Sequence, residues 1–157
     1  MDAVTLLVAQ LDQAYDRKSW HGTNLRGSLR GLKVAQAAWR PGPGRHNIWE
    51  IAVHAAYWKY AVRRRVAGGA RGSFPLTGSN WFERSGDGGE KAWQADLRLL
   101  QETHRALRAA VAALTPAALL GTPAGSTVST QALVSGIIAH DLYHAGQIQL
   151  IKRLQRR

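Results

Sequence analysis

Residues 136–151 read GIIAHDLYHAGQIQLI, and this stretch near the C-terminal end decides how the chain folds. Its apolar residues and those beside it recur at intervals of three and four, which is typical of one face of an α-helix. His140 and His144 stand four positions apart within it. Their imidazoles therefore lean the same way and could reach one cation. Gln147 continues that face one turn later.

Three more long amphipathic helices are predicted upstream of this one. The apolar spacing predicts helices over about residues 2–18, from Asn47 to Gly68, over 90–114, and from Thr127 or Ser129 to about residue 155. No segment alternates convincingly as a strand does. Four long amphipathic helices in one chain indicate an all-α fold, a four-helix bundle.

The segments between the long helices also carry signals. Short helices are expected around 24–32, 33–39 and 116–120. The RPGPG sequence at 40–44 stops the chain from continuing as a helix, because proline and glycine both break helices. Residues 70–90 mix glycine, serine and proline with aromatic residues, and so predict a long loop that covers a site.

The histidine pair needs a third ligand from elsewhere in the chain. There is no cysteine, so this ligand has to be another histidine or a carboxylate. Side chains on facing helices of a bundle share one core, and we predict that His54 on the second long helix completes the site. A single inward histidine is more often an ordinary core residue, but three buried imidazoles are costly without partners. His104 is predicted to be solvated, and His21 and His46 to cap helices or lie exposed.

Five further residues are candidates for supporting roles. Glu50 and Asp141 could accept the N–H of a ligating imidazole and fix its tautomer. For each of these carboxylates, a surface or helix-capping role is an equal alternative. Tyr143 and Gln147 are weak catalytic candidates, since a tyrosine in a bundle is usually a core residue. Together with Arg71 in the loop, they could orient a substrate.

Length and composition favour one domain in a reducing compartment. A chain of 157 residues suits a single domain over residues 1–157. The lack of cysteine agrees with a cytoplasmic location. The N-terminus lacks the basic start of a signal peptide. No apolar run approaches the roughly 18 residues of a membrane span, so we expect no membrane partner.

The net charge of +11 comes mostly from arginine, in RRR at 63–65 and in KRLQRR at 152–157. Such charge attracts nucleic acid, acidic lipid or anionic metabolites. No basic motif interleaved with aromatic residues and no nucleic-acid signature accompanies it. We interpret most of the charge as a solvated surface, which leaves nucleic-acid binding open but not favoured.

Two segments, AHDLYHAGQI at 139–148 and WEIAVHAAYW at 49–58, resemble the DinB/YfiT-like superfamily of metal-binding four-helix proteins. The resemblance covers essentially the whole chain, and HxxxH followed by GQI is its most specific part. It implies a divalent metal held by His54, His140 and His144, commonly zinc or nickel. Three histidines do not by themselves exclude iron or manganese. The resemblance also implies an S-transferase-like reaction that moves a low-molecular-weight thiol, such as bacillithiol or mycothiol, to an electrophilic small-molecule substrate.

Two other functions remain open from the sequence. The same site could activate water and make the protein a metal-dependent hydrolase. Alternatively, the chain could be a non-enzymatic, stress-related protein that binds a metal or ligand and uses its basic surface. A homodimer is expected, because bundles of this kind often pair through exposed helix faces, although no residue identifies the face.

Overall fold

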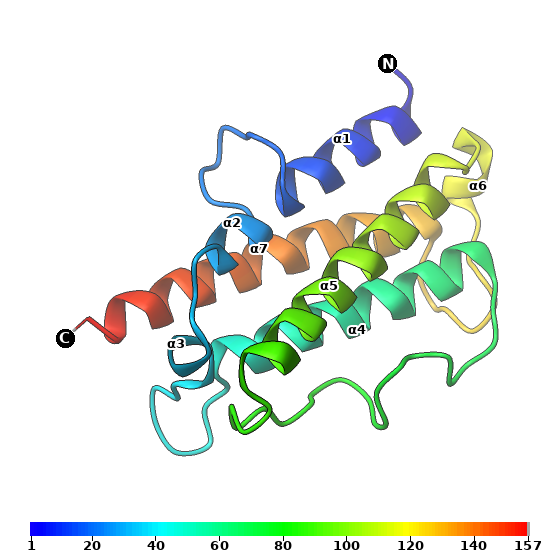
Figure 1. Ribbon diagram of the computed structural model, residues 1–157. Coiled ribbons are helices and arrows are strands. Elements are labelled where there is room, and N and C mark those ends of the chain that lie inside the picture. Colours follow the sequence, from blue (N-terminus) through cyan, green and yellow to red (C-terminus); the bar gives the residue numbers. More distant parts are fainter. Residues whose placement is uncertain (157) are drawn as a thin grey trace.

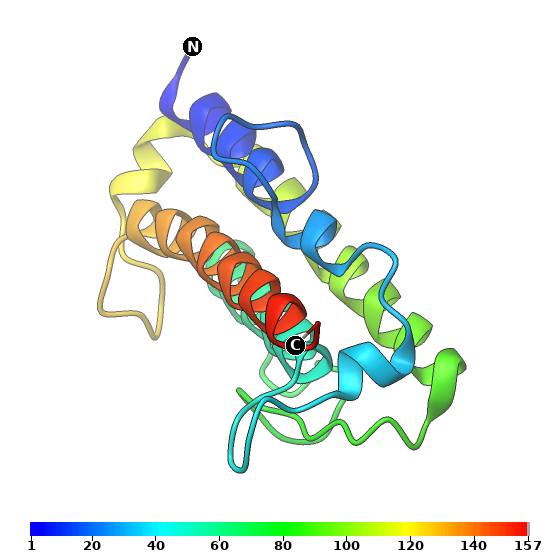
Figure 2. The ribbon, with the colours of Figure 1, turned by 90° about the vertical axis from the view of Figure 1, so that its left-hand side faces the viewer.

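The computed structural model describes residues 1–156, and within them the chain forms seven helices and no strand. The helices are α1 (Ala3–Tyr15), α2 (Leu25–Leu29), α3 (Val34–Ala38), α4 (Ile48–Ala67), α5 (Gly89–Ala112), α6 (Pro116–Leu120) and α7 (Thr130–Leu154). Four of them are long, α1, α4, α5 and α7, and Figures 1 and 2 show the short helices at the connections between them. The prediction of an all-α bundle with extra short helices is confirmed.

The order of the long helices around the bundle follows from their contacts. α4 packs against α5 and α7, and α1 packs against the same two helices. α4 and α1 therefore lie diagonally opposite each other. α4 and α7 run antiparallel along one side, as Figure 1 shows, which sets the middle of α4 against the middle of α7.

Side-chain caps fix the starts of the two helices that carry the predicted ligands. Asn47 accepts a hydrogen bond from the backbone N–H of Glu50, and the Glu50 side chain reaches back to the N–H of Asn47. This is the predicted capping box. α4 ends at Ala67 and is capped by Gly68, whose φ of 72° favours glycine. Ser129 caps α7 by accepting from the N–H of Ala132.

Apolar side chains form two packed clusters along the bundle. One contains Trp49 and Trp93, whose rings meet edge to face with centroids 5.3 Å apart. The other contains Leu107 and Val111 of α5. α4 and α7 contribute to both clusters, and burying each large apolar side chain stabilises the fold by about 1.5–3 kcal/mol. The segments of α4 and α7 between the clusters are thus held firmly, and they carry polar side chains.

The long loop predicted between the second and third long helices is present. It runs beside α4 in Figure 1 and buries the rings of Phe74 and Phe82 against the core. Asn80 has a φ of 66°, the one positive value at a non-glycine residue in the described chain. Its side-chain oxygen accepts a hydrogen bond from Nε1 of Trp58 at 2.9 Å. The loop is therefore tied to α4 near His54.

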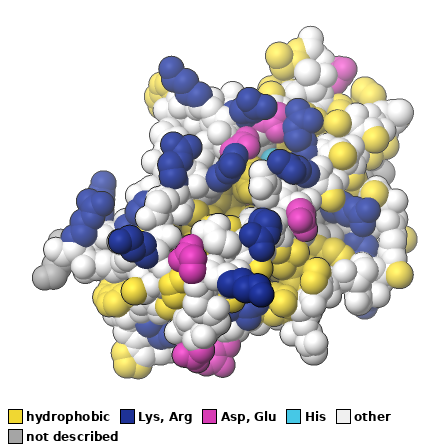
Figure 3. Space-filling model, viewed as in Figure 1, with side chains coloured by type: hydrophobic (Ala, Val, Ile, Leu, Met, Phe, Trp, Pro, Cys, Tyr) yellow, Lys and Arg dark blue, Asp and Glu magenta, His cyan; other side chains and the backbone are white. Residues whose placement is uncertain are grey.

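Basic side chains are spread over the surface and are not confined to one patch in the view of Figure 3. Lys and Arg cover much of that face, with Asp and Glu among them. The predicted arginine cluster at 152–157 ends on Arg157, which lies outside the described residues. Across residues 1–156, no helix has both the length and the apolarity that crossing a membrane requires.

Candidate metal centre

Three histidines meet where the middle of α4 faces the middle of α7. His54 comes from α4, and His140 and His144 come from α7. The Nε2 atom of His140 lies 3.1 Å from Nε2 of His54 and 3.1 Å from Nε2 of His144. One ring nitrogen from each residue lies within 4.8 Å of the other two. The structure thus brings together the three histidines named from the sequence.

The three imidazoles are held in the neutral form. Burial is the main cause, and it lowers the pKa of His54 to about 4 and that of His140 to about 3. It also lowers the pKa of His144. The two neighbouring rings lower the pKa of His140 further. A neutral imidazole carries a lone pair, which is the form that binds a metal ion.

Two contacts fix the orientation of His54. Its Nδ1 lies 2.8 Å from the backbone carbonyl of Asn80, which can only accept, so the ring proton sits on Nδ1 and the Nε2 lone pair faces the cluster. Trp81 stacks on the ring of His54 with centroids 3.8 Å apart and planes at 9°. His46 stacks on the same indole at 3.6 Å and 4°. Two rings cannot share one face at these distances, so Trp81 is sandwiched between the two histidines.

Gln147 orients His144. Its side-chain oxygen accepts from Nδ1 of His144 at 2.7 Å, and its amide nitrogen donates to the hydroxyl of Tyr143 at 3.1 Å. This leaves the Nε2 lone pair of His144 facing the other two rings. Nδ1 of His140 is buried and has no hydrogen-bond partner in the described chain. The tautomers of His54 and His144 are therefore set from outside the cluster, whereas that of His140 is not.

Glu50, predicted to support a ligating histidine, has other partners. Its carboxylate accepts two hydrogen bonds from Arg40, at 2.5 Å and 3.0 Å, and one from Nδ1 of His46 at 2.9 Å. It makes no hydrogen bond to the three clustered histidines. Its influence on the site passes through His46, which stacks on Trp81.

Asp141, the second carboxylate predicted to support the site, points into the core. It pairs with Lys59 at 2.5 Å, and both side chains are fully buried. Nζ of Lys59 also lies 3.4 Å from Nδ1 of His104 and 5.0 Å from the centroid of the Tyr15 ring. We call Lys59, Asp141, His104 and Tyr15 the ion-pair cluster. Neither predicted carboxylate therefore accepts the N–H of a clustered imidazole. For His54, the backbone carbonyl of Asn80 accepts it instead.

The prediction that His104 is solvated is wrong. The residue is 4% exposed, and its ring stacks on Tyr15 with centroids 3.7 Å apart. The prediction rested on the polar residues near it in the sequence, Gln101, Arg105 and Arg108. The useful signal was its position four residues after the buried Leu100, on the apolar stripe of α5. His21 and His46 are exposed, as predicted.

A pocket of about 650 Å³ opens beside the histidine cluster. His144, Gln147 and Tyr143 form one wall, with Trp81 next to them. Apolar side chains near the end of α7 and the segment from Pro41 to His46, which includes Arg45, also line it, and His144 is the one clustered histidine that does. The volume lies within the range of about 300–1,000 Å³ that small-molecule sites occupy. Arg71, predicted to orient a substrate here, lines a different pocket.

A comparison with family models agrees with this arrangement. The model of the DinB superfamily matches residues 15–148, which include all three clustered histidines. The chain belongs to the DinB superfamily. The resemblance carried by the segments around His54 and around the HxxxH motif is thereby confirmed. Searches among curated proteins and among solved structures each gave no match.

The histidine cluster of this DinB chain has the dimensions of a metal site. With metal–nitrogen bonds of about 2.0–2.1 Å, two nitrogen ligands lie about 3.3 Å apart in a tetrahedral site and about 3.0 Å apart in an octahedral one. The two closest Nε2 separations are both 3.1 Å. The two separations to His140 therefore suit a divalent cation, and all three neutral donors lie within 4.8 Å of one another.

Proposed function

We propose that this DinB chain is a divalent-metal-dependent enzyme that transfers a low-molecular-weight thiol to an electrophilic small molecule. The convergence of the Nε2 atoms of His54, His140 and His144 beside an open pocket carries this proposal. These three histidines would hold the cation, with zinc or nickel as first candidates and iron or manganese as alternatives. Because three neutral ligands leave the double charge of the cation unneutralised, it would lower the pKa of a bound thiol or water.

The residues of the pocket have separate tasks in this proposal. Gln147 holds the ring of His144, and its amide also positions the hydroxyl of Tyr143. Tyr143 is 64% exposed, so its hydroxyl is free to donate to a leaving group on the acceptor. Trp81 shields the face of His54 from water, and Arg45 offers a positive charge to an anionic part of either substrate.

A metal-dependent hydrolase is the alternative reaction at the same site. Water would take the place of the thiol, while the pocket would bind the electrophile in the same way. Assays with and without the thiol separate the two reactions. A non-enzymatic metal-binding protein would bind the cation and turn over neither.

The first experiment is elemental analysis of the untagged protein beside the variant His54→Ala/His140→Ala. His21→Ala is the matched control, because His21 is exposed and lies outside the cluster. We expect about one transition metal per chain in the wild type and the control, and none in the double variant. The metal-loaded protein is then assayed with bacillithiol or mycothiol and an aryl halide. A wild type that stays metal-free after reconstitution would overturn the proposal. So would a metal-loaded protein whose absorption spectrum and activity do not change when the thiol is added.

A further inference from the structure

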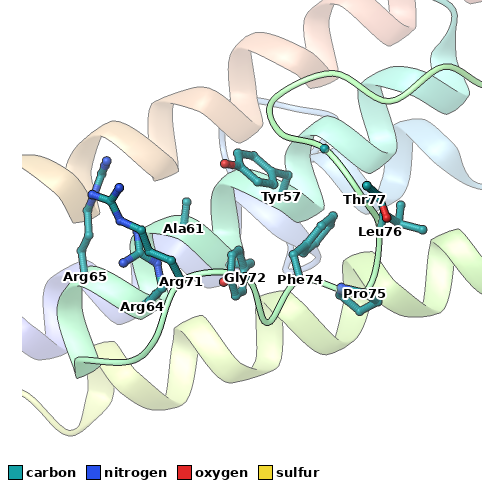
Figure 4. Close-up of a pocket in the computed structure, with 12 residues that line it drawn as sticks. Tyr57, Ala61, Arg64, Arg65, Arg71, Gly72, Phe74, Pro75, Leu76 and Thr77 are labelled. Carbon is teal, nitrogen blue, oxygen red and sulfur yellow. The ribbon is translucent and has the colours of Figure 1, made fainter.

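A second pocket lies between the C-terminal half of α4 and the loop that follows it, as Figure 4 shows. Its volume is about 520 Å³, which again suits a small molecule. α4 contributes Arg64 and Arg65, and the loop contributes Arg71. The lining includes no aspartate, glutamate or histidine. This pocket is therefore strongly positive, and none of the three metal-site histidines takes part in it.

The three arginines of this pocket have no carboxylate partner within residues 1–156. Arg64 and Arg65 lie in the last turn of α4, where a positive side chain stabilises the helix dipole. Arg71 lies beyond the end of the helix and has no such role. Three like charges around one cavity repel one another, and an anion bound among them would remove that cost.

The other end of the pocket is aromatic. Figure 4 shows the arginines gathered at one end, with Tyr57 and Phe74 towards the other. The rings of Tyr57 and Phe74 meet edge to face, with centroids 5.4 Å apart and planes at 88°. Phe74 is buried, which fixes this wall in place. A ligand that is anionic at one end and apolar at the other would match both ends.

Tyr60 also lines this pocket and adds a hydrogen-bond donor to it. Its hydroxyl oxygen accepts from the backbone N–H of Ser73 at 3.1 Å and from the Ser73 hydroxyl at 3.2 Å. The proton of the Tyr60 hydroxyl is then left for a ligand, because both of these bonds use the oxygen as acceptor. The same bonds tie the loop to α4, so the pocket exists before any ligand arrives.

We propose that this pocket binds a small organic phosphate. The phosphate would lie among Arg64, Arg65 and Arg71, and its apolar or aromatic part would rest on Tyr57 and Phe74. Guanidinium groups pair with two oxygens of one phosphate at a time. A phosphate dianion balances three positive charges better than the single charge of a carboxylate does. This site is independent of the histidine cluster and of the reaction proposed there.

The test is calorimetric titration with phenyl phosphate, with inorganic phosphate and benzoate as comparison ligands at constant ionic strength. The binding variant is Arg64→Gln/Arg71→Gln. Arg63→Gln is the matched control. Arg63 is on the same helix and also has no carboxylate partner among the described residues, but it does not line the pocket. We expect equal binding by the wild type and the control, and at least about tenfold weaker binding by the double variant.

The comparison ligands test which parts of phenyl phosphate matter. Inorganic phosphate lacks the ring and benzoate lacks the second charge, so both should bind more weakly. In amide NMR spectra of the wild type, phenyl phosphate should shift the signals of Gly72, Ser73 and Gly78, which lie on the pocket loop. Shifts centred on the histidine cluster instead would overturn the assignment.

Three other results would also contradict the proposal. Benzoate binding more tightly than phenyl phosphate would make the site one for carboxylates. If Arg63→Gln and the double variant weaken phenyl phosphate binding equally, the ligand is held by the general positive charge of the surface, as nucleic acid would be, and not by this pocket. Absence of phenyl phosphate binding at millimolar concentration would exclude the site. If the double variant unfolds, Arg71→Gln replaces it, because this residue is exposed in the loop.

Discussion

Two clusters of largely buried polar side chains join α4 to α7, and they meet at consecutive residues of α7; the ion-pair cluster also draws on α1 and α5. His140 belongs to the histidine cluster, and Asp141 belongs to the ion-pair cluster with Lys59 and His104. In the histidine cluster, three neutral rings turn their Nε2 atoms towards one another. In the ion-pair cluster, a positive and a negative charge already balance each other. We propose that a cation from outside completes the first cluster. In the second, the chain supplies the opposite charge itself, although Oδ1 of Asp141 has no hydrogen-bond partner within residues 1–156.

This contrast shows that burial does not distinguish a proposed metal ligand from a histidine of the ion-pair cluster. His54 is 5% exposed, His144 is 3% exposed and His104 is 4% exposed. What differs is the atom that each ring nitrogen faces. The first two face other imidazole nitrogens, whereas His104 faces the amine of Lys59 and the ring of Tyr15.

The largest effect on metal affinity is expected from His140→Ala, which tests whether the histidine cluster differs from the ion-pair cluster in binding a cation. Within residues 1–156, Nδ1 of His140 has no hydrogen-bond partner, so this change removes a donor from the proposed metal site without breaking a hydrogen bond outside the cluster. We expect metal affinity to fall by more than about 100-fold, beyond the effect of losing an outer hydrogen bond. Competition with a chelator measures it, and His21→Ala should leave affinity unchanged. If His140→Ala binds the metal as tightly as the wild type does, the histidine cluster is not the metal site.

The corresponding change in the ion-pair cluster is Lys59→Met. It leaves the charge of Asp141 buried without its partner, and breaking such a pair costs about 3–5 kcal/mol. Urea unfolding should show this loss in the free energy of unfolding. The double variant Lys59→Met/Asp141→Leu should recover most of it, because neither charge then remains in the core. A loss below about 1 kcal/mol in the single variant would mean that water reaches Asp141.

The sequence predicted the fold and the three clustered histidines because both depend on periodic spacing. The apolar repeats placed the long helices to within a few residues, and HxxxH on one helix face needs only helical geometry. His54 followed from the packing of facing helices. These features are local or depend on a known architecture.

The orienting contacts could not be predicted, because they join segments far apart in the sequence. His54 is held by Asn80, 26 residues away, and the bond uses a backbone carbonyl that no residue type reveals. Lys59 and Asp141 are 82 residues apart. A lysine on an amphipathic helix ordinarily reaches solvent, so its burial depended on a partner that only the folded chain supplies.

Gln147→Leu tests the orientation of His144. The change removes the acceptor for Nδ1 of His144 while keeping a similar side-chain volume. Losing such an outer partner lowers metal affinity by about 10–100-fold. Gln149→Leu, two residues further along α7, is the matched control, since Gln149 makes no side-chain hydrogen bond to this cluster. Equal affinities of the two variants would show that packing alone orients the ring of His144.

His104→Phe tests the ion-pair cluster through pH dependence, and near pH 7 we expect it to have almost no titration effect on stability. Burial first, and then the charges of Lys59 and Arg108, lower the pKa of His104 from 6.5 to about 2. Below about pH 6.5 the unfolded chain therefore binds a proton at His104 that the folded chain does not bind. The free energy of unfolding consequently falls as the pH falls. Above that pH the ring is neutral in both states and contributes nothing.

Phenylalanine at position 104 keeps a ring to stack on Tyr15 but cannot titrate. The difference in unfolding free energy between His104→Phe and the wild type should therefore shift in favour of the variant by about 1.4 kcal/mol for each pH unit between about 6 and 4. Urea unfolding at pH 7.5, 5.5 and 4.5 measures this difference, in which the contributions of the clustered histidines cancel. Parallel curves for the two proteins would mean that His104 takes up its proton at the same pH in the folded and unfolded chains. In that case the charge of Lys59 would not act on the neighbouring His104 ring. The proposed contrast between the ion-pair cluster and the histidine cluster would then fail.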